Sequence, residues 1–215
     1  MRWLAVSLLA LVLAACGGGE REHGTATLWV TRDRGAQVLY AGSVPAGLTA
    51  MQALERKLKV TTRYGGRFVQ SIDGVSGSAS AERDWLYFVN GIEAEQGAAE
   101  VRLQPGDVEW WDYRSWHGSG FSVPVVVGAF PEPFRHGFEW AKPGAHVSGS
   151  GPSVRKLQQL VGRGPNSIVV DAAVPAGSAL AARDGSVVKL VLGVRAAARL
   201  AANPAAFRYR YEVGE

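Results

Sequence analysis

The N-terminal half of the chain alternates apolar and polar positions in short runs, which is the pattern of β-strands. One stretch differs: Met51 and Leu54 recur at helical spacing, and Thr49 with Gln52 forms a capping box ahead of them. Strands are predicted within residues 25–33, 37–43, 60–73 (as a hairpin), 84–90, 101–103 and 108–113. This order predicts an α+β domain over residues 25–116, with one helix packed on a sheet.

The C-terminal half, residues 119–215, mixes both periodicities and predicts a second, small α/β domain. Helices are expected from Pro152 and over residues 194–202, whereas residues 131–151 are rich in Pro, Gly and Ser and predict loops. Strands are expected over residues 121–130, 167–173, 186–192 and 207–213. The resulting β-α-β-β-α-β order predicts a ferredoxin-like sandwich.

The first residues of the chain follow a third pattern. Arg2 precedes a largely apolar run over residues 3–15. As a helix this run would be about 20 Å long, which is shorter than the hydrocarbon core of a bilayer, about 30 Å. Its length therefore predicts the hydrophobic region of a signal peptide over residues 1–16.

The end of that run, Leu13-Ala14-Ala15-Cys16, resembles the lipobox of bacterial lipoproteins. The resemblance implies that the Cys16 thiol receives a diacylglyceryl group and that Cys16 becomes the first mature residue. Residues 17–24, which begin with three glycines, would then be a flexible tether. The implied location is the outer face of the cell membrane, through a lipid anchor. The alternative is a plain secretory peptide with an incidental cysteine.

Composition and charge exclude several further classes of protein. Hydrophobic residues make up 47% and charged residues 20% of the chain, as in ordinary folded proteins. The single cysteine excludes an intramolecular disulfide. Residues 119–215 hold 11 Lys/Arg and 6 Asp/Glu, against 10 and 11 in residues 25–118. Because the basic residues of the C-terminal half are scattered singly or in pairs, no nucleic-acid partner is expected.

Several short motifs occur in an order that is informative as a set: Leu48–Leu54, Ser71–Gly74, Trp85–Gly91, Gly97, Leu103–Asp107 and Trp111. Together they resemble the transcobalamin-like C-terminal β-grasp domain over most of residues 25–116. Many bacterial members of that family are small extracellular lipoproteins, and in vitamin carriers the domain closes over cobalamin from one side. The resemblance thus implies cobalamin or a related corrinoid as ligand. The chain departs from the pattern at Glu109, often apolar in the family, and nothing in it resembles the carriers' larger helical domain.

Aromatic side chains concentrate in residues 85–116, which hold seven of the chain's 20. Strand alternation places Trp85 and Tyr87 on the face opposite Phe88, and likewise separates Trp110 from Trp111. Both faces of the predicted sheet are then apolar, although a single helix covers only one.

The second face has three interpretations. The C-terminal half packs on it; it forms a stacking platform for a flat ligand such as a corrin, for a sugar or for a partner protein; or it mediates self-association. The ligand-binding residues expected from the second interpretation are Trp85, Tyr87, Trp111, Tyr113 and Trp116.

The sequence contains no catalytic motif of the types G-x-S-x-G or H-E-x-x-H, and its four histidines lack metal-ligand spacing. Ser148 and Ser150 lie close to His146, but Gly- and Ser-rich loops are common. No enzyme, resident cofactor or metal site is therefore expected. The function predicted is an exported surface lipoprotein whose β-grasp domain binds a ligand. The alternative is a protein-interaction or envelope-assembly module with no small-molecule ligand.

Overall fold

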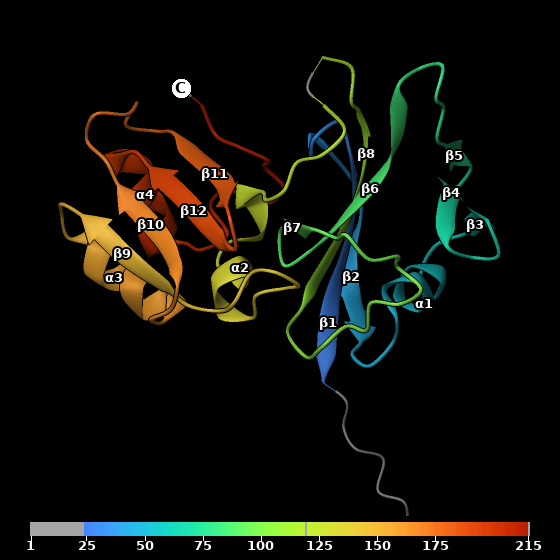
Figure 1. Cartoon of the computed structure of the whole chain (residues 1–215), viewed down its shortest axis with the longest axis horizontal. Helices are drawn as coiled ribbons and strands as arrows, with labels where there is room; N and C mark the ends of the chain where they lie inside the picture. The colour runs from blue at the N-terminus through green and yellow to red at the C-terminus, as the bar shows by residue number, and fades with distance from the viewer. Residues whose placement is uncertain (1–23, 119, 215) are drawn as a thin grey trace, which may run out of the picture.

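The computed structural model describes residues 24–118 and 120–214, which form two lobes side by side (Figure 1). The predicted signal peptide, Cys16 and residues 17–23 of the predicted tether lie outside the described residues. Both lobes contain strands and helices, and the predicted α+β class is confirmed. None of the helices in the described part is long and apolar enough to cross a membrane.

The N-terminal domain is built on a five-stranded sheet in the order β2-β1-β8-β6-β7, with β1 and β8 parallel at its centre. The strands are β1 (Thr25–Arg32), β2 (Gln37–Pro45), β6 (Arg83–Val89), β7 (Ile92–Glu93) and β8 (Val108–Ser115). Helix α1 (Ala50–Glu55) begins at the predicted capping box, in which the Thr49 side chain accepts from the Gln52 N–H.

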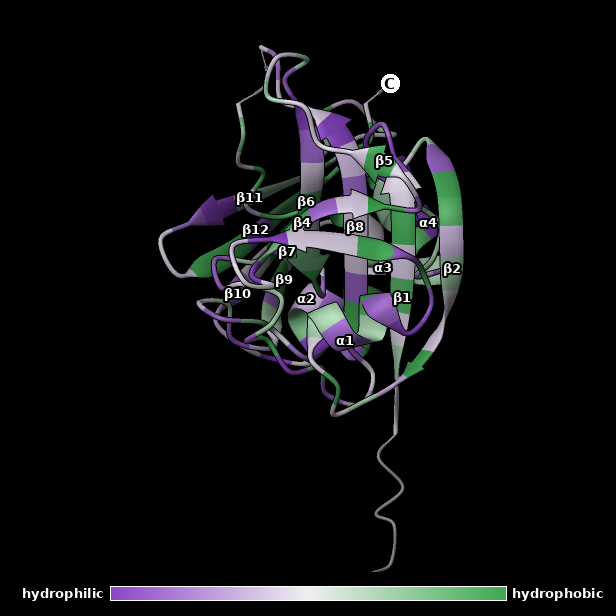
Figure 2. Ribbon diagram, turned by 90° about the vertical axis from the view of Figure 1, so that its right-hand side faces the viewer, coloured by the Kyte–Doolittle hydropathy of each residue, from purple (hydrophilic) through white to green (hydrophobic). Residues whose placement is uncertain are grey.

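A second, three-stranded sheet of β3 (Val60–Arg63), β4 (Phe68–Ile72) and β5 (Val75–Ser76) lies beside α1 on the same face of the large sheet (Figure 2). The hairpin predicted over residues 60–73 is confirmed, because β3 and β4 pair antiparallel around residues 64–67. The strand predicted over residues 101–103 is wrong: only Arg102 is bridged, to Thr49.

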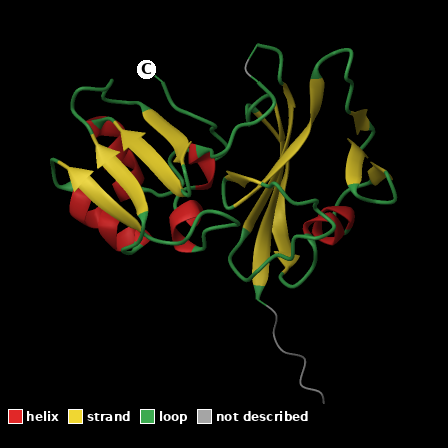
Figure 3. Ribbon diagram, viewed as in Figure 1, coloured by secondary structure: helices red, strands yellow, loops and turns green. Residues whose placement is uncertain are grey.

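The C-terminal domain is a four-stranded sheet in the order β11-β12-β10-β9, with helices packed against it (Figure 3). Its elements are η1 (Val127–Ala129), α2 (Glu132–Arg135), β9 (Ala145–Gly149), α3 (Ser153–Val161), β10 (Asn166–Val170), β11 (Ala179–Asp184), β12 (Val187–Leu192) and α4 (Val194–Ala202). Strands β9, β10 and β12 run parallel, and β11 pairs antiparallel with β12. The predicted helices over residues 194–202 and after Pro152 are both found.

The ferredoxin-like order predicted for this domain is wrong. Residues 121–130 contain Pro124 and form the short helix η1 in place of a strand. Residues 131–151, predicted as loops, contain α2 and strand β9. Residues 207–213 alternate apolar and polar side chains as a strand would, yet they form turns and join the sheet only at the Ala179–Val213 bridge. Tyr209 and Tyr211 pack against the N-terminal domain, whereas Phe207 belongs to the core of the C-terminal domain.

Candidate functional site

The register of β6 against β8 sorts the aromatic side chains onto two faces of the large sheet. Tyr87 lies opposite Trp111, and Phe88 lies opposite Trp110. The first pair points towards α1 and the small sheet, together with Trp85 and Tyr113. The second pair points the other way. The prediction that both faces are apolar is therefore confirmed.

The second face, here the closed face, consists of Trp29, Phe88 and Trp110. It is covered by residues 207–213, here the C-terminal segment. The Tyr209 ring meets Trp29 edge-on at 4.9 Å between ring centroids, and Tyr211 meets both Phe88 and Trp110 at 5.4 Å. These edge-to-face contacts have the geometry that aromatic quadrupoles favour. The closed face is therefore interdomain core, as the first interpretation of the sequence expected.

A buried carboxylate fixes the C-terminal segment on the closed face. Both Asp112 oxygens accept hydrogen bonds: from the Thr31 hydroxyl at 2.5 Å, the Tyr211 hydroxyl at 2.9 Å, and the N–H groups of Arg34 and Gly35 at 3.0 and 3.2 Å. Four donors therefore satisfy both oxygens of this carboxyl group. Gly35 has φ 79°, and a Cβ there would overlap the carbonyl oxygen of Tyr209, so only glycine permits this approach.

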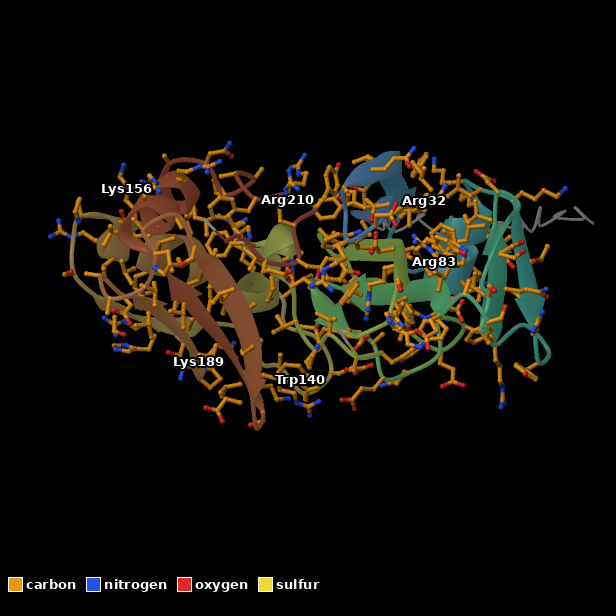
Figure 4. The ribbon with its side chains drawn as sticks, turned by 90° about the horizontal axis from the view of Figure 1, so that it is seen from above. Arg32, Arg83, Trp140, Lys156, Lys189 and Arg210 are labelled. Carbon is orange, nitrogen blue, oxygen red and sulfur yellow. The ribbon has the colours of Figure 1, made fainter. Side chains whose placement is uncertain are left out.

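The first face, here the open face, borders a cavity of about 390 Å³ between the two domains. Its aromatic walls come from distant parts of the chain: Phe68, Trp85, Tyr87, Trp111, Phe121 and Trp140. Its polar lining includes Arg67, Glu93, Glu95, Gln96, Ser122 and Arg183. Seen from above, Trp140 lies at the junction of the two domains, on the side opposite Arg210 of the C-terminal segment (Figure 4). Cavity and C-terminal segment thus occupy opposite sides of the junction.

The structure brings three of the five sequence-predicted binding residues to this cavity: Tyr87, which is half-buried, and Trp85 and Trp111, of whose surfaces only 5% and 3% are exposed. Tyr113 is enclosed, with 7% of its surface exposed, and its hydroxyl donates to the Ser76 carbonyl at 3.0 Å. Trp116 is half-buried against Phe121 and does not line the cavity.

The cavity floor is a stacked pair of rings. Tyr87 and Trp111 lie 4.7 Å apart with 17° between their planes, and the Tyr87 hydroxyl donates to the Gln96 carbonyl. Burial raises the pKa of the Tyr87 phenol, and the nearby Glu139 carboxylate raises it further. The indole N–H of Trp111 donates to Glu109 at 2.6 Å. Both rings are therefore held at their polar ends, which fixes the orientation of the floor.

Glu109 lies fully buried beneath Trp111. One of its oxygens accepts the indole hydrogen bond, and the other has no partner among the described residues. Burial raises the pKa of this carboxyl well above its usual value. The departure from the family pattern noted in the sequence thus supplies the hydrogen-bond acceptor that orients Trp111.

The rim of the cavity ties the two domains together. The Glu139 carboxylate accepts from the N–H groups of Glu95 and Gln96 at 3.1 Å. Arg183, from β11, pairs with Glu95 at 2.6 Å and stacks over the Trp140 ring at 4.3 Å. The rim therefore depends on residues from both halves of the chain.

Sequence reasoning did not find Phe68, Phe121, Trp140 or Arg183. They lie in four separate segments, and no local motif links them. The one available signal was Trp140, a tryptophan inside a stretch predicted to be loop, where exposed rings are uncommon.

The cavity lining combines flat aromatic surface with a few charged side chains. Stacked rings offer flat apolar contact, while Glu95 and Arg183 already neutralise each other at the rim. Within the described residues, no group of three or more His, Cys, Asp or Glu side chains is arranged to hold a metal ion. A cavity of this size, apolar with a few polar groups, is typical of small-molecule sites.

A family model matches the part of the chain that contains α1 and the aromatic strands β6 and β8. Residues 47–115 match the model of a domain of unknown function, DUF4430, which covers about a third of the chain. No curated protein matches the chain.

Two solved structures are similar to part of this chain, with low TM-scores. One is a protein from Ruminococcus gnavus ATCC 29149 that is provisionally described as metal-binding, with 15% identity and a TM-score of 0.36 over 43% of this chain and 97% of that one. The other is haptocorrin in complex with Cbi, with 14% identity and a TM-score of 0.35 over 42% of this chain and 25% of that one. Residues 47–115 are thus similar to a domain family whose function is undefined.

Proposed function

We propose that this chain is an exported lipoprotein that binds a small flat molecule in the cavity on its open face. The observation that carries the proposal is the cavity of about 390 Å³ with aromatic walls from both domains. Stacking on aromatic side chains contributes about 1–3 kcal/mol per ring in nucleic-acid complexes. The stacked floor and the Trp140 wall are the surfaces on which such a ligand would lie.

The ligand class we propose is a corrinoid or a related flat molecule, as the transcobalamin-like resemblance implies. The cavity lies near the lower end of the range for drug-sized ligands, about 300–1,000 Å³. A whole corrinoid carries amide side chains around its macrocycle and exceeds drug size. Only one edge of the macrocycle would therefore enter between Tyr87 and Trp140, and the rest would project from the mouth.

Equilibrium dialysis of the full chain against hydroxocobalamin tests the ligand. We expect retention of the corrinoid, together with a shift in its visible absorbance. Trp140→Ala removes one wall and should weaken binding at least about fivefold, which is the lower limit for one stacked ring. Trp116→Ala is the matched control, because Trp116 is also half-buried but lies outside the cavity. Equal binding by both variants, or no retention by the native chain, would remove the corrinoid proposal.

The lipid anchor is tested separately. Mass spectrometry of the mature N-terminus should show Cys16 as the first residue, carrying the mass of a diacylglyceryl group, and Cys16→Ala should abolish the modification. An unmodified or uncleaved N-terminus in the native protein would exclude lipoprotein processing and leave the cavity proposal untouched.

A protein-interaction module remains the second candidate, favoured by two exposed rings at the cavity mouth. Phe121 is 54% exposed and Phe68 is 40% exposed, so a partner could bury both. A Phe68→Ser, Phe121→Ser variant should lose a specific cross-linked partner in intact membranes while keeping its thermal stability. An unchanged cross-linking pattern would exclude this face as an interface.

A further inference from the structure

Half of the positive charge of the N-terminal domain lies in one short stretch. Residues 56–67 contain five Lys/Arg and no Asp/Glu, whereas the rest of residues 25–118 contains five Lys/Arg and eleven Asp/Glu. The five basic residues are Arg56, Lys57, Lys59, Arg63 and Arg67. The domain is therefore strongly asymmetric in charge, although its net charge is close to zero.

The fold presents this stretch on one side of the molecule. It runs from the end of α1 through β3 to the turn before β4, which lie nearest the viewer in Figure 2 and farthest from the C-terminal domain in Figure 1. All five basic side chains are exposed, and within residues 24–118 and 120–214 none of them forms an ion pair. Arg63 interacts electrostatically with the nearby Asp84 carboxylate, which offsets part of the mutual repulsion of the five.

Two exposed rings lie at the tip of the same hairpin. Tyr64 is 78% exposed and meets Phe68, itself 40% exposed, at 6.4 Å between ring centroids. Tyr64 has φ 53°, a left-handed conformation that β-turns usually assign to Gly or Asn, and its ring does not join the core. We define the basic aromatic surface as these two rings together with the five basic residues.

The described chain begins beside the segment that leads into α1. The carbonyl of Gly24 accepts from the Ala46 N–H at 2.8 Å, in the segment that leads into α1. Cys16 is eight residues before Gly24, a separation of at most about 28 Å when fully extended. A lipid anchor at Cys16 would therefore keep the surface within reach of a bilayer.

We propose that the basic aromatic surface lies against an anionic lipid bilayer, with its Lys and Arg side chains at the phosphates and Tyr64 and Phe68 at the headgroup level. Basic side chains near an anionic leaflet add to binding one by one, and amphipathic rings favour the membrane–water interface. The inference rests on the proposed lipid anchor, which selects a bilayer over an acidic protein. Because Arg67 and Phe68 also line the cavity, its mouth would face the region of the bilayer.

Hydrogen exchange of the full chain, reconstituted in vesicles, tests this contact. Amides of residues 56–68 should exchange at least about tenfold more slowly on vesicles containing phosphatidylglycerol than on phosphatidylcholine alone, and high salt should abolish the difference. The turn between β11 and β12 is the internal control and should exchange equally on both. Equal exchange of residues 56–68 on the two vesicle types would overturn the proposal.

Two matched charge variants sharpen the test. Replacing the five basic residues of the surface by Gln should remove the protection. Replacing five exposed basic residues of the C-terminal domain by Gln removes the same net charge and should leave the protection intact; these are Lys142, Arg155, Lys156, Arg163 and Lys189. Tyr64→Ala, at an exposed site that does not threaten folding, should reduce it partially. Equal loss in both charge variants would show a nonspecific attraction and overturn the proposal.

These outcomes distinguish a failure of the surface proposal from a failure of the lipid-anchor proposal. If the chain sediments with phosphatidylcholine vesicles but residues 56–68 gain no protection on anionic ones, the anchor stands and the surface proposal fails. If Cys16 is unmodified, salt-sensitive binding to anionic vesicles through residues 56–68 still supports the surface. Protection by polyglutamate but not by anionic vesicles would overturn the bilayer assignment in favour of an acidic partner.

Discussion

The two faces of the large sheet start from the same surplus of aromatic side chains and end differently. On the closed face, Tyr209 and Tyr211 insert against Trp29 and Trp110 and complete a core. On the open face, α1 and the small sheet cover Tyr113, and a cavity remains beside Trp111. Aromatic content alone therefore does not distinguish core from binding surface; the covering segment does.

Two buried carboxyl groups on β8 show the same difference in another form. Asp112, on the closed face, receives four hydrogen bonds, two at each carboxyl oxygen. Glu109, on the open face, receives one from the Trp111 indole, and its burial raises its pKa. Both oxygens of Asp112 are thus hydrogen-bonded, whereas one oxygen of Glu109 has no partner among the described residues.

The largest expected effect is at the contact that closes the second face. Tyr211→Ala removes a buried ring and the hydroxyl that donates to Asp112, so the free energy of unfolding should fall by about 3–5 kcal/mol in urea denaturation. Tyr211→Phe retains the ring and should cost about 1–2 kcal/mol. A loss below about 1 kcal/mol for Tyr211→Ala would mean that the C-terminal segment is not part of the core.

Asp112→Asn tests the polar network on the same face. The amide nitrogen of the new Asn side chain would point a donor at one of the groups that now donate to Asp112. The free energy of unfolding should therefore fall by about 3 kcal/mol. Thr31→Val removes only one of the four donors and should cost less. Equal effects of the two substitutions in urea denaturation would contradict a carboxylate-centred network.

Glu109→Gln should have a smaller effect, and its sign should depend on pH. The unfolded chain ionises Glu109 near its usual pKa, about 4.3, whereas the folded chain keeps the proton to higher pH. The folded state then binds more protons, so the free energy of unfolding falls as pH rises, by at most about 1.4 kcal/mol per pH unit. Glu109→Gln should remove this slope and stabilise the protein at neutral pH.

Urea denaturation between about pH 5 and 7 measures that slope. Glu55→Gln, on the exposed side of α1, is the control and should leave the pH dependence of the native chain unchanged. Parallel pH profiles for the native chain and Glu109→Gln would show that Glu109 does not hold its proton in the folded state.

The smallest stability effect is expected at the rim of the open face. Arg183→Ala breaks a partly exposed ion pair with Glu95 and the contact with Trp140, and should change the free energy of unfolding by less than about 1 kcal/mol. Its effect should instead appear as faster dissociation of a bound ligand, measured by stopped flow. Unchanged dissociation together with a large loss of stability would make this pair structural.

Local sequence signals predicted local structure well. The capping box at Thr49, the hairpin around residues 64–67 and helix α4 are all found, because each depends on contacts between near neighbours. The failures, residues 121–130 and 207–213, have strand-like composition, but some of their side chains, such as Val126 and Tyr211, pack on the closed face of the other domain's sheet. Their conformation depends on contacts formed across the molecule.

The candidate site was likewise predictable from the sequence only where it depends on local strand alternation. Alternation along β6 and β8 was enough to bring Tyr87 and Trp111 together, since a strand's side chains follow its register. It could not show that Tyr113 is covered, because its cover comes from β5, a two-residue strand with no pattern of its own. Nor could it supply Trp140 and Arg183, which reach the cavity from the second domain.

By itself, then, the sequence determined that the large sheet has two apolar faces and that residues 56–67 are basic without acidic neighbours in the stretch, because both are properties of order along the chain. Only the tertiary structure decided which face is closed, where the cavity lies and which side of the molecule carries the basic residues. Burial is a matter of which distant segments meet, and a residue's place in the sequence does not specify the neighbours that exclude water from it.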